Sequence, residues 1–302
     1  MEELLTLIDG KEVKITNPHK LLWPEAGVTK LDYITYLLAV SPYLLPYTQD
    51  RLLMRWRYPD GPAGERIEEK SIPNHAPDWV ARARYKDKMW IVLNDPATLV
   101  WTANREALEL HVPFDRCQHK NMPTELVFDL DPPDSEHFPL VLQVAWELKQ
   151  VLDSLGLVSV AKTSGVSGMQ VHVPIEPRYT FEETRVINKF IADYMLQKMP
   201  DLLTLERVVR RRGGKLYFDY LQLWKGRTIA APYSVRATPQ ATVSAPVLWE
   251  EVKKGFDPAD FTVHTMQKRV EEKGDLFRPL TADKYRYQQS LDPILSFLRA
   301  HV

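Results

Sequence analysis

The sequence predicts an α+β fold with mixed or antiparallel sheets flanked by helices. Between residues 126 and 231 the apolar pattern follows the order strand, helix, strand, strand, helix, strand, strand. Strands that follow one another directly favour antiparallel pairing, because a parallel pair needs a long crossover connection. The chain shows no internal repeat, low-complexity linker or sharp boundary, so we expect one domain over residues 1–302.

The first elements have clear local signals. Residues 5–16 predict a β-hairpin, because Asp9-Gly10 separates two apolar runs. The other elements expected before residue 126 are a helix over 30–40 capped by Thr29, a strand over 88–93, and a helix from Asp95-Pro96 through Leu110.

Two longer helices are predicted in the second half by apolar residues at helical spacing. They cover residues 139–156, where Gly156 ends the pattern, and Phe181 to Met199. The strands expected beside them are residues 126–131, Val158–Lys162, Val171–Ile175, Lys215–Leu221 and its candidate partner Arg227–Ala231. A last helix, from Asp292 to His301, is expected to pack on the body of the domain.

Composition bounds the protein class. The net charge of −1 excludes a globally basic, histone-like chain, but a local basic patch is sufficient for phosphate contacts. The single cysteine, Cys117, excludes an intrachain disulfide and a cysteine-rich zinc module. The N-terminus is acidic and unlike a secretory signal, and the most apolar run, residues 34–46, contains two prolines and is too short to span a bilayer. We expect a soluble cytoplasmic protein without a membrane partner.

Two aspartates, Asp129 and Asp131, end the apolar run that begins at Leu126. Alternate residues of a strand share a face, so both carboxylates are expected to project from one side. Carboxylates this close repel, and a divalent cation such as Mg²⁺ or Mn²⁺ would make the pairing favourable. The alternative interpretation is a surface strand end with two solvated aspartates.

Asp219 is a third candidate, within the strand-like run from Lys215 to Leu221. Its neighbours are apolar or aromatic, and a charge there is rarely buried unless it is paired or bound to metal. The alternative is a salt bridge to Arg210, Arg211 or Arg212. Three carboxylates on two strands, with basic residues nearby, suggest metal-dependent phosphoryl transfer.

Three further segments carry groups suited to phosphate. The first is the glycine-containing loop from Lys162 to Gly168, where Ser164 offers a hydroxyl and Gln170 and His172 follow on one strand face. The others are the basic run 207–215, which holds five cations, and the N-terminal turn that contains Lys20, followed by Lys30. Their alternatives are an ordinary β-turn, a solvated charged hairpin and a structural loop.

Together these residues resemble the polymerase (primase-like) domain of ligase D, a member of the archaeo-eukaryotic primase superfamily that serves non-homologous end joining. The resemblance runs from about Val13 to Leu280. It rests on seven stretches, in this order: Thr16–Pro24, Arg57–Gly61, Leu108–Pro113, Val127–Pro132, Lys162–Gly165, Phe218–Tyr220 and Ala231–Arg236. It implies a primase-like fold with an RRM-like catalytic sheet over about 121–285, an N-terminal α/β part over about 1–120, and a C-terminal helix within 286–302.

The resemblance also implies an activity. The chain would be a nucleotidyltransferase that fills gaps and extends ends at double-strand breaks, with a preference for ribonucleotides and two Mg²⁺ or Mn²⁺ ions. The implied roles are metal binding by Asp129, Asp131 and Asp219; triphosphate contacts by His111, Ser164, Gln222 and Arg236, with Gln170 and His172 nearby; contact with the template or a synapsed end by Arg212; and recognition of a downstream 5′-phosphate by Lys20 and Lys30.

The chain departs from the family pattern at three positions. Ser167 stands where a lysine is usual, Gln170 where a histidine is usual, and Glu68 where a stacking phenylalanine is usual. These departures motivate a second hypothesis, a module that binds and bridges DNA ends with little synthesis. A third hypothesis is a primase that starts chains de novo. By resemblance, the partners would be nucleoside triphosphates, gapped or broken DNA, a Ku-like protein and a DNA ligase, in a nucleoid-associated cytoplasmic setting.

Overall fold

The structure is a computed structural model that describes residues 2–281 and 288–301. The chain divides into two compact units, each assembled from three segments. The first unit comprises the residues up to Pro113 with Thr228–Ala245 and Ala259–Asp275; the second comprises Phe114–Arg227, Pro246–Pro258 and the residues from Leu276 onward. Because both units are discontinuous in sequence, no change of composition along the chain marks a boundary between them.

The first unit begins with the predicted hairpin. Strands β1 (Glu3–Ile8) and β2 (Lys11–Thr16) pair antiparallel. Asp9 and Gly10 have positive φ angles of 48° and 75°, which the tight turn requires and which these residue types tolerate. The hairpin is therefore confirmed. A second antiparallel pair, β3 (Leu21–Trp23) with β4 (Val28–Thr29), follows.

Helix α1 (Lys30–Thr48) begins where the sequence predicts, with Thr29 as its N-cap. Thr29 Oγ1 accepts from the Asp32 N–H at 3.2 Å, and the Asp32 carboxylate accepts from the Thr29 N–H at 2.9 Å, so both halves of a capping box are present. The helix does not end near residue 40 as expected; it continues through Pro42 and Pro46. Its C-terminal part is buried, and this packing outweighs the hydrogen bonds that the prolines remove.

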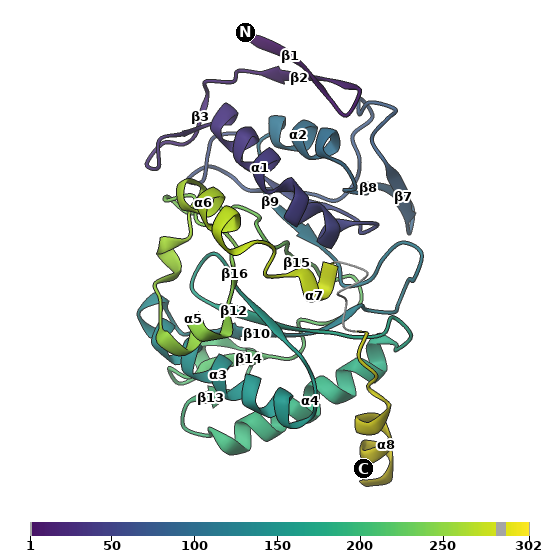
Figure 1. The fold of residues 1–302 in the computed structure, drawn as a ribbon, viewed down its shortest axis with the longest axis vertical. Coiled ribbons are helices and arrows are strands. Elements are labelled where there is room, and N and C mark those ends of the chain that lie inside the picture. Colours follow the sequence, from purple (N-terminus) through teal and green to yellow (C-terminus); the bar gives the residue numbers. More distant parts are fainter. Residues whose placement is uncertain (1, 282–287, 302) are drawn as a thin grey trace. The chain divides into compact units, whose positions relative to one another are not determined.

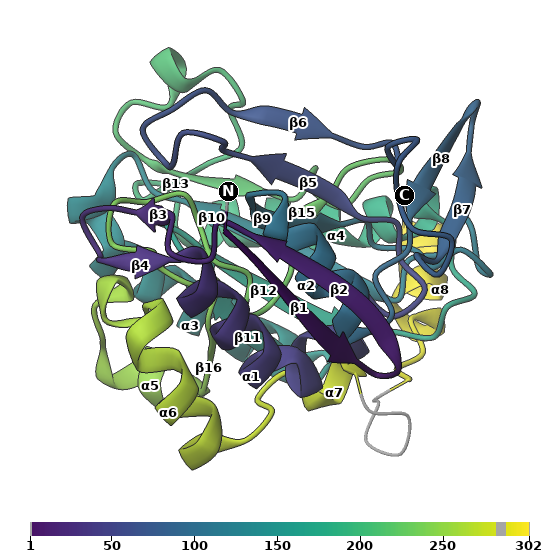
Figure 2. The same cartoon turned by 90° about the horizontal axis from the view of Figure 1, so that it is seen from above.

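The first unit contains a four-stranded antiparallel sheet, of which β5 (Met54–Arg57) and β6 (Ile67–Glu69) are seen side by side in Figure 2. Its order is β15 (Ile229–Ala230), β9 (Ala107–Val112), β5 and β6. Residues 227–231 were expected to pair with the strand over 215–221. That prediction is wrong, because β15 pairs with β9. The unit also contains the hairpin of β7 (Arg82–Tyr85) with β8 (Lys88–Ile91), and helix α6 (Val263–Lys273).

The helix predicted from Asp95 through Leu110 is confirmed in its first part and wrong in its second. Helix α2 (Pro96–Asn104) is capped by Asp95, whose side chain accepts from the Thr98 N–H at 2.9 Å, but it stops at Asn104. Glu106 has a positive φ of 56°, which breaks the helical path. The following residues become β9, a strand that is buried along its whole length between β15 and β5. Pairing with neighbouring strands thus decides the secondary structure of residues 107–112, whose local sequence pattern is ambiguous.

The second unit is built on a six-stranded sheet that is antiparallel except for one parallel pair, β13 with β14. The mixed sheet predicted from the sequence is thereby confirmed. The strand order is β13 (Leu203–Thr204), β14 (Leu216–Asp219), β10 (Glu125–Asp131), β12 (Met169–Pro174), β11 (Val160–Thr163) and β16 (Pro246–Val247).

Helices α3 (Phe138–Ser154) and α4 (Phe181–Lys198) cover one face of this sheet (Figure 1), and both predicted helices are confirmed. Leu126, Phe128 and Leu130 are fully buried on one face of β10. The opposite face of the sheet carries Asp129, Asp131 and Asp219. Phe277 packs on the same face, against His172. The remaining elements are α5 (Trp249–Lys254), α7 (Arg278–Thr281), α8 (Asp292–His301) and the short 3₁₀ turns Ser135–His137, Val209–Arg211 and Pro258–Asp260.

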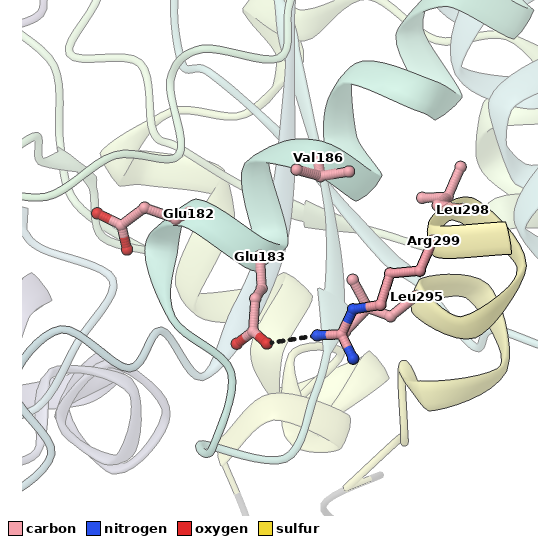
Figure 3. Close-up of a pocket in the computed structure, with 6 residues that line it drawn as sticks. All are labelled: Glu182, Glu183, Val186, Leu295, Leu298 and Arg299. Atoms are coloured by element: carbon pink, nitrogen blue, oxygen red, sulfur yellow. Dashed lines mark hydrogen bonds and ion pairs between the residues drawn. The ribbon is translucent and has the colours of Figure 1, made fainter. Parts of the chain in front are cut away.

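The C-terminal helix α8 has the predicted bounds, and it packs beside α4. A hollow of about 370 Å³ lies between them, lined by Glu182, Glu183, Val186, Leu295, Leu298 and Arg299. Figure 3 shows Arg299 reaching back to Glu183, and their ion pair is 3.2 Å long. None of the site residues predicted from the sequence lines this hollow. No helix in the described part of the chain is long and apolar enough to cross a membrane.

Candidate active site

The three aspartates lie on one face of the second unit's sheet. Asp129 and Asp131 are alternate residues of β10, and Asp219 on β14 stands directly opposite Asp129 in the antiparallel register. Residues opposite one another in such a pair have their side chains on the same side. The register therefore joins the early acid pair to the late acid, although they are far apart in the sequence.

The negative charges on this acidic face are unfavourable, because the carboxylates are buried and repel one another. Burial raises the pKa of Asp129 well above its usual range, and repulsion by Asp131 and Asp219 raises it further. The pKa of Asp131 is also raised, first by burial and then by Asp219. Within residues 2–281 and 288–301, Asp129 Oδ1 is buried and has no hydrogen-bond partner. A divalent cation would relieve the repulsion and satisfy this oxygen.

The acids do not form a closed coordination sphere as their side chains stand. Among the residues that the structure describes, no three Asp, Glu, His or Cys side chains converge closely enough to hold a metal ion. Asp219 instead accepts from the Leu221 N–H at 2.8 Å and lies 3.8 Å from Arg227. Its ion-pair partner is thus Arg227, beyond the basic run that the sequence suggested. Three carboxylates on one face, one with an unsatisfied oxygen, still fit the oxygen-only ligand set of Mg²⁺ or Mn²⁺.

The glycine-containing loop packs tightly against the acid pair. Ser164 Oγ accepts from the backbone N–H groups of Val166 at 3.1 Å and Gly168 at 3.0 Å, which closes the turn. A side chain at Gly168 would bring its Cβ within 2.4 Å of the Leu130 carbonyl oxygen, so only glycine fits there. The loop therefore brings its backbone close to the end of β10, where Asp131 lies.

A buried lysine also belongs to the acidic face. Gln170 stands opposite Asp129 and donates a hydrogen bond to it, and Lys162 stands opposite Gln170 on the next strand. Lys162 Nζ donates to Gln170 Oε1, and Lys162 is fully buried. Its positive charge lowers the pKa of Asp129, against the larger effect of burial. From the sequence, Lys162 was expected at the end of a strand and the start of the loop motif, without a role at the acidic face. The pairing of β11 with β12 sets Lys162 opposite Gln170, and so on the face that carries the acids.

His172 lies on the same face but one step further from the acids, opposite Val127. It is fully buried, and its Nδ1 lies 2.7 Å from Glu125 Oε2. Its ring contacts Phe277, with centroids 5.1 Å apart. This burial favours a structural role for His172 over the nucleotide contact expected for it.

The basic run lies beside the acidic face. Arg212 stacks on Tyr217, with its Cζ 4.0 Å from the ring centroid, and its guanidinium donates to the Glu206 carbonyl at 3.2 Å. Its charge lowers the pKa of Asp131, although burial raises that pKa more. Gln222 accepts a hydrogen bond of 3.4 Å from Arg227. The second unit thus brings together Asp129, Asp131, Asp219, Ser164, Gln170, Gln222 and Arg212 of the predicted residues, on adjoining strands and loops.

In the first unit, Glu109 joins His111 and Arg236, two of the residues expected to contact a triphosphate. Its Oε2 lies 2.9 Å from His111 Nε2 and accepts from Arg236 Nε at 2.9 Å, while its Oε1 accepts from the Ala237 N–H at 3.0 Å. Burial alone would raise the pKa of Glu109, but the bond to His111 and the charge of Arg236 bring it below its usual value. Glu109 was not among the predicted site residues, although it alternates with His111 within the recognised stretch Leu108–Pro113.

An aromatic ring lies next to His111. Trp56 is opposite Glu109 on β5, and its ring centroid is 4.4 Å from that of His111. Arg66 lies over the Trp56 ring at 4.2 Å, and Glu68, at the position where the family usually has phenylalanine, stands opposite Trp56 on β6. The strand next to Glu68 therefore supplies an aromatic side chain on the face that carries His111.

Lys20 and Lys30 meet at Glu106. Lys30 is fully buried and donates to Glu106 at 2.8 Å and to the Asn104 carbonyl at 2.9 Å. Lys20 is partly exposed; it donates to the Pro59 carbonyl at 2.6 Å and lies 3.6 Å from Glu106. The surrounding network contains more cations than carboxylates, namely Lys20, Lys30, Arg55, Arg57 and Arg105 against Glu69 and Glu106.

Comparison with known proteins assigns the family. Residues 29–277 match the family described as LigD, primase-polymerase domain. The chain belongs to this family. Primase-polymerase domains of LigD are nucleotidyltransferases, so the reaction class expected from the resemblance is confirmed.

The relatives agree with this assignment. The chain is 40% identical over 288 residues to the bifunctional non-homologous end joining protein LigD of Bacillus subtilis, which covers 95% of this chain and 46% of that protein. It is 32% identical over 281 residues to the multifunctional non-homologous end joining protein LigD of Mycolicibacterium smegmatis, covering 90% of this chain and 36% of that protein. The chain thus spans less than half the length of these curated relatives.

The fold has a close solved counterpart. The structure of the polymerase domain from Mycobacterium tuberculosis ligase D in complex with DNA superposes with a TM-score of 0.83 at 31% sequence identity. The match covers 90% of this chain and 98% of that one. The predicted α+β, primase-like fold is therefore confirmed.

Proposed function

We propose that this LigD-type domain extends primer ends and fills short gaps at DNA breaks during non-homologous end joining. The observation that carries the proposal is the strand register, which sets Asp219 opposite Asp129 on the face that also bears Asp131. A primase-polymerase needs acidic ligands for divalent cations, and this face offers three carboxylates with unrelieved repulsion.

Asp129 and Asp131 would hold two divalent ions between them, and Asp219 would hold the ion nearer the primer 3′-hydroxyl. Bound there, Mg²⁺ or Mn²⁺ would lower the pKa of that hydroxyl and offset the charge of the leaving pyrophosphate. The chain's own groups do the positioning. The tight loop presents the Ser164 hydroxyl, whose oxygen is fixed by two backbone N–H groups of the turn, and hydrogen bonding from Gln170 favours the charged form of Asp129.

In the first unit, His111 and Arg236 offer N–H donors, and Arg236 adds the positive charge that a triphosphate needs. Both are oriented by the buried carboxylate of Glu109. By family resemblance we include Gln222 among the triphosphate contacts, a preference for ribonucleotides, and a Ku-like protein and a DNA ligase as partners in end joining.

The decisive experiment is extension of a gapped substrate with a downstream 5′-phosphate, using ribonucleotides and deoxyribonucleotides separately, with Mg²⁺ and with Mn²⁺. We expect incorporation of the templated nucleotide, faster with the ribonucleotide. Absence of incorporation with both metals and both nucleotide types would overturn the polymerase proposal.

The second candidate function is recognition of DNA ends with little synthesis. The specific observation in its favour is the excess of positive charge around Lys20, which lies in the first unit and needs no metal. Tight binding of 5′-phosphorylated gapped DNA, together with negligible extension in the assay above, would support this candidate.

Replacing Lys20 with alanine should reduce the preference for a 5′-phosphorylated gap over a 5′-hydroxyl gap by about tenfold, because one charge-assisted hydrogen bond to the phosphate is lost. Fluorescence anisotropy with the two DNA substrates measures the ratio. Lys14→Ala, which removes an exposed lysine paired with Glu3 at 2.8 Å, is the matched control. An unchanged ratio for Lys20→Ala would contradict the assignment.

Replacing Glu109 with glutamine should raise the KM for the nucleotide by about tenfold and change kcat less, because His111 and Arg236 lose the charge that orients them. Steady-state extension at saturating DNA measures both constants. Glu147→Gln, which removes a partly exposed ion pair with Lys198, is the control. A normal KM in a variant that unfolds at the parental temperature would show that Glu109 does not act on nucleotide binding.

A further inference from the structure

Arg185 on α4 lies against the ring of Trp224. Its guanidinium carbon is 3.5 Å from the ring centroid, which is close stacking contact. The Trp224 ring also makes an edge-to-face contact with Phe181, with the ring centroids 6.4 Å apart. An arginine held on an aromatic face loses side-chain freedom before it meets a ligand, so it binds with a smaller entropic cost.

The hydrogen-bond donors of Arg185 are not used within the part of the chain that the structure describes. It makes no hydrogen bond or ion pair there, and its Nε is buried without a partner. A second arginine of the same unit provides the contrast. Arg178 stacks on Tyr179 at 4.4 Å, but its guanidinium is bound by Asp292 at 2.6 Å and by Glu176.

Two further arginines lie near enough to Arg185 for their charges to act on it. Burial lowers its pKa, and the nearby cations Arg227 and Arg207 lower it further, while Asp219 and Tyr220 act in the opposite direction. Arg207 is exposed and has no ion pair among the described residues. Arg212 forms a further arginine–aromatic stack of this unit, on Tyr217. An anion would bring favourable interactions to this surface that the protein itself does not supply.

We propose that Arg185, braced by Trp224 and assisted by Arg207, binds a backbone phosphate of the nucleic acid strand that passes the acidic face of the second unit. The proposal rests on the proposed polymerase function, and it adds a named strand-binding surface. A guanidinium offers parallel donors that match phosphate, and stacked arginine and aromatic residues are typical of proteins that follow single strands.

The location of Arg185 favours a nucleic acid over an acidic peptide. Arg185 is close enough to Asp219 for their charges to interact, and Asp219 belongs to the acids that would act on the primer end. A strand must approach these acids for nucleotidyl transfer, whereas nothing in that chemistry brings a peptide there. An acidic peptide that competes with DNA only through general charge screening is one outcome that the experiment distinguishes.

The test measures affinity for DNA with a 3′ single-stranded overhang over a series of salt concentrations, without nucleotide or divalent cation. For Arg185→Ala we expect about tenfold weaker binding, and a slope of log affinity against log salt that is less steep by about one. Arg185→Lys keeps the charge and should retain most of the slope. Arg178→Ala removes a stacked arginine whose donors are already used, so it should match the parent.

Thermal unfolding of each variant shows that the comparison concerns folded protein. A parental salt slope for Arg185→Ala overturns the inference, and so does an equal loss in Arg178→Ala. If the slope falls as expected while the parent fails to extend primers, the inference stands and the proposed polymerase function falls. If the parent extends primers but the slope is unchanged, the polymerase function stands without this surface.

Discussion

Primer extension is expected to fall by about three orders of magnitude or more when Asp129 is replaced by asparagine. Asparagine keeps the shape of the side chain but lacks the negative charge that divalent cations need. The position is central to the acidic face, because Asp219 lies opposite it, Asp131 is its alternate neighbour, and Gln170 donates to it. Single-turnover extension with saturating nucleotide measures the loss.

A second measurement on the same variant does not depend on turnover. A ligand that binds only the folded state stabilises it, by about 2.7 kcal/mol at a concentration one hundred times its Kd. Mg²⁺ or Mn²⁺ should therefore raise the unfolding temperature of the parent protein and have much less effect on Asp129→Asn. Affinity for gapped DNA should stay close to the parental value.

Asp193→Asn is the matched control, because Asp193 is an exposed aspartate of the same unit, paired with Lys189 at 2.6 Å. It should extend primers and respond to metal like the parent. Parental extension by Asp129→Asn would refute the assignment of this residue. A metal-dependent rise in its unfolding temperature equal to that of the parent would place the cations elsewhere.

Replacing Glu125 with alanine should lower the free energy of unfolding by about 3–5 kcal/mol, the range expected when one member of a buried charged pair is removed. Glu125 and His172 are both fully buried, and their contact is 2.7 Å long. The variant leaves the His172 ring without its carboxylate partner in a region also filled by Phe277. Urea denaturation of parent and variant gives the difference.

The double variant Glu125→Leu with His172→Leu tests the role of the histidine. Exchanging both partners for apolar groups should recover much of the lost stability, because neither side chain is then left buried without the other. If His172 is structural, this variant should keep a near-parental KM for nucleotide once folded. A large rise in KM with recovered stability would instead support the nucleotide contact that the sequence analysis expected. A loss below about 1 kcal/mol for Glu125→Ala would contradict the buried-pair assignment.

Local chemistry was sufficient to predict those features that depend on neighbours in the chain. Asp9-Gly10 specified its hairpin turn, Thr29 specified the start of α1, and apolar periodicity identified α3 and α4. The placement of Asp129 and Asp131 on one face follows from the strand period alone. The order of the motifs indicated the primase-polymerase family, which the family match confirmed.

Only the tertiary structure decided which segments pair. The residues Ala107–Val112 fit a helix by pattern, but burial between two strands makes them β9. Arg227–Ala231 was expected beside the strand that bears Asp219, yet β15 pairs with β9. The line from Lys162 through Gln170 to Asp129, and the bonds from Glu109 to His111 and Arg236, likewise join segments that are distant in the sequence. Periodicity and capping act over one or two turns of chain, whereas strand register is set by packing among segments brought together only in the folded state.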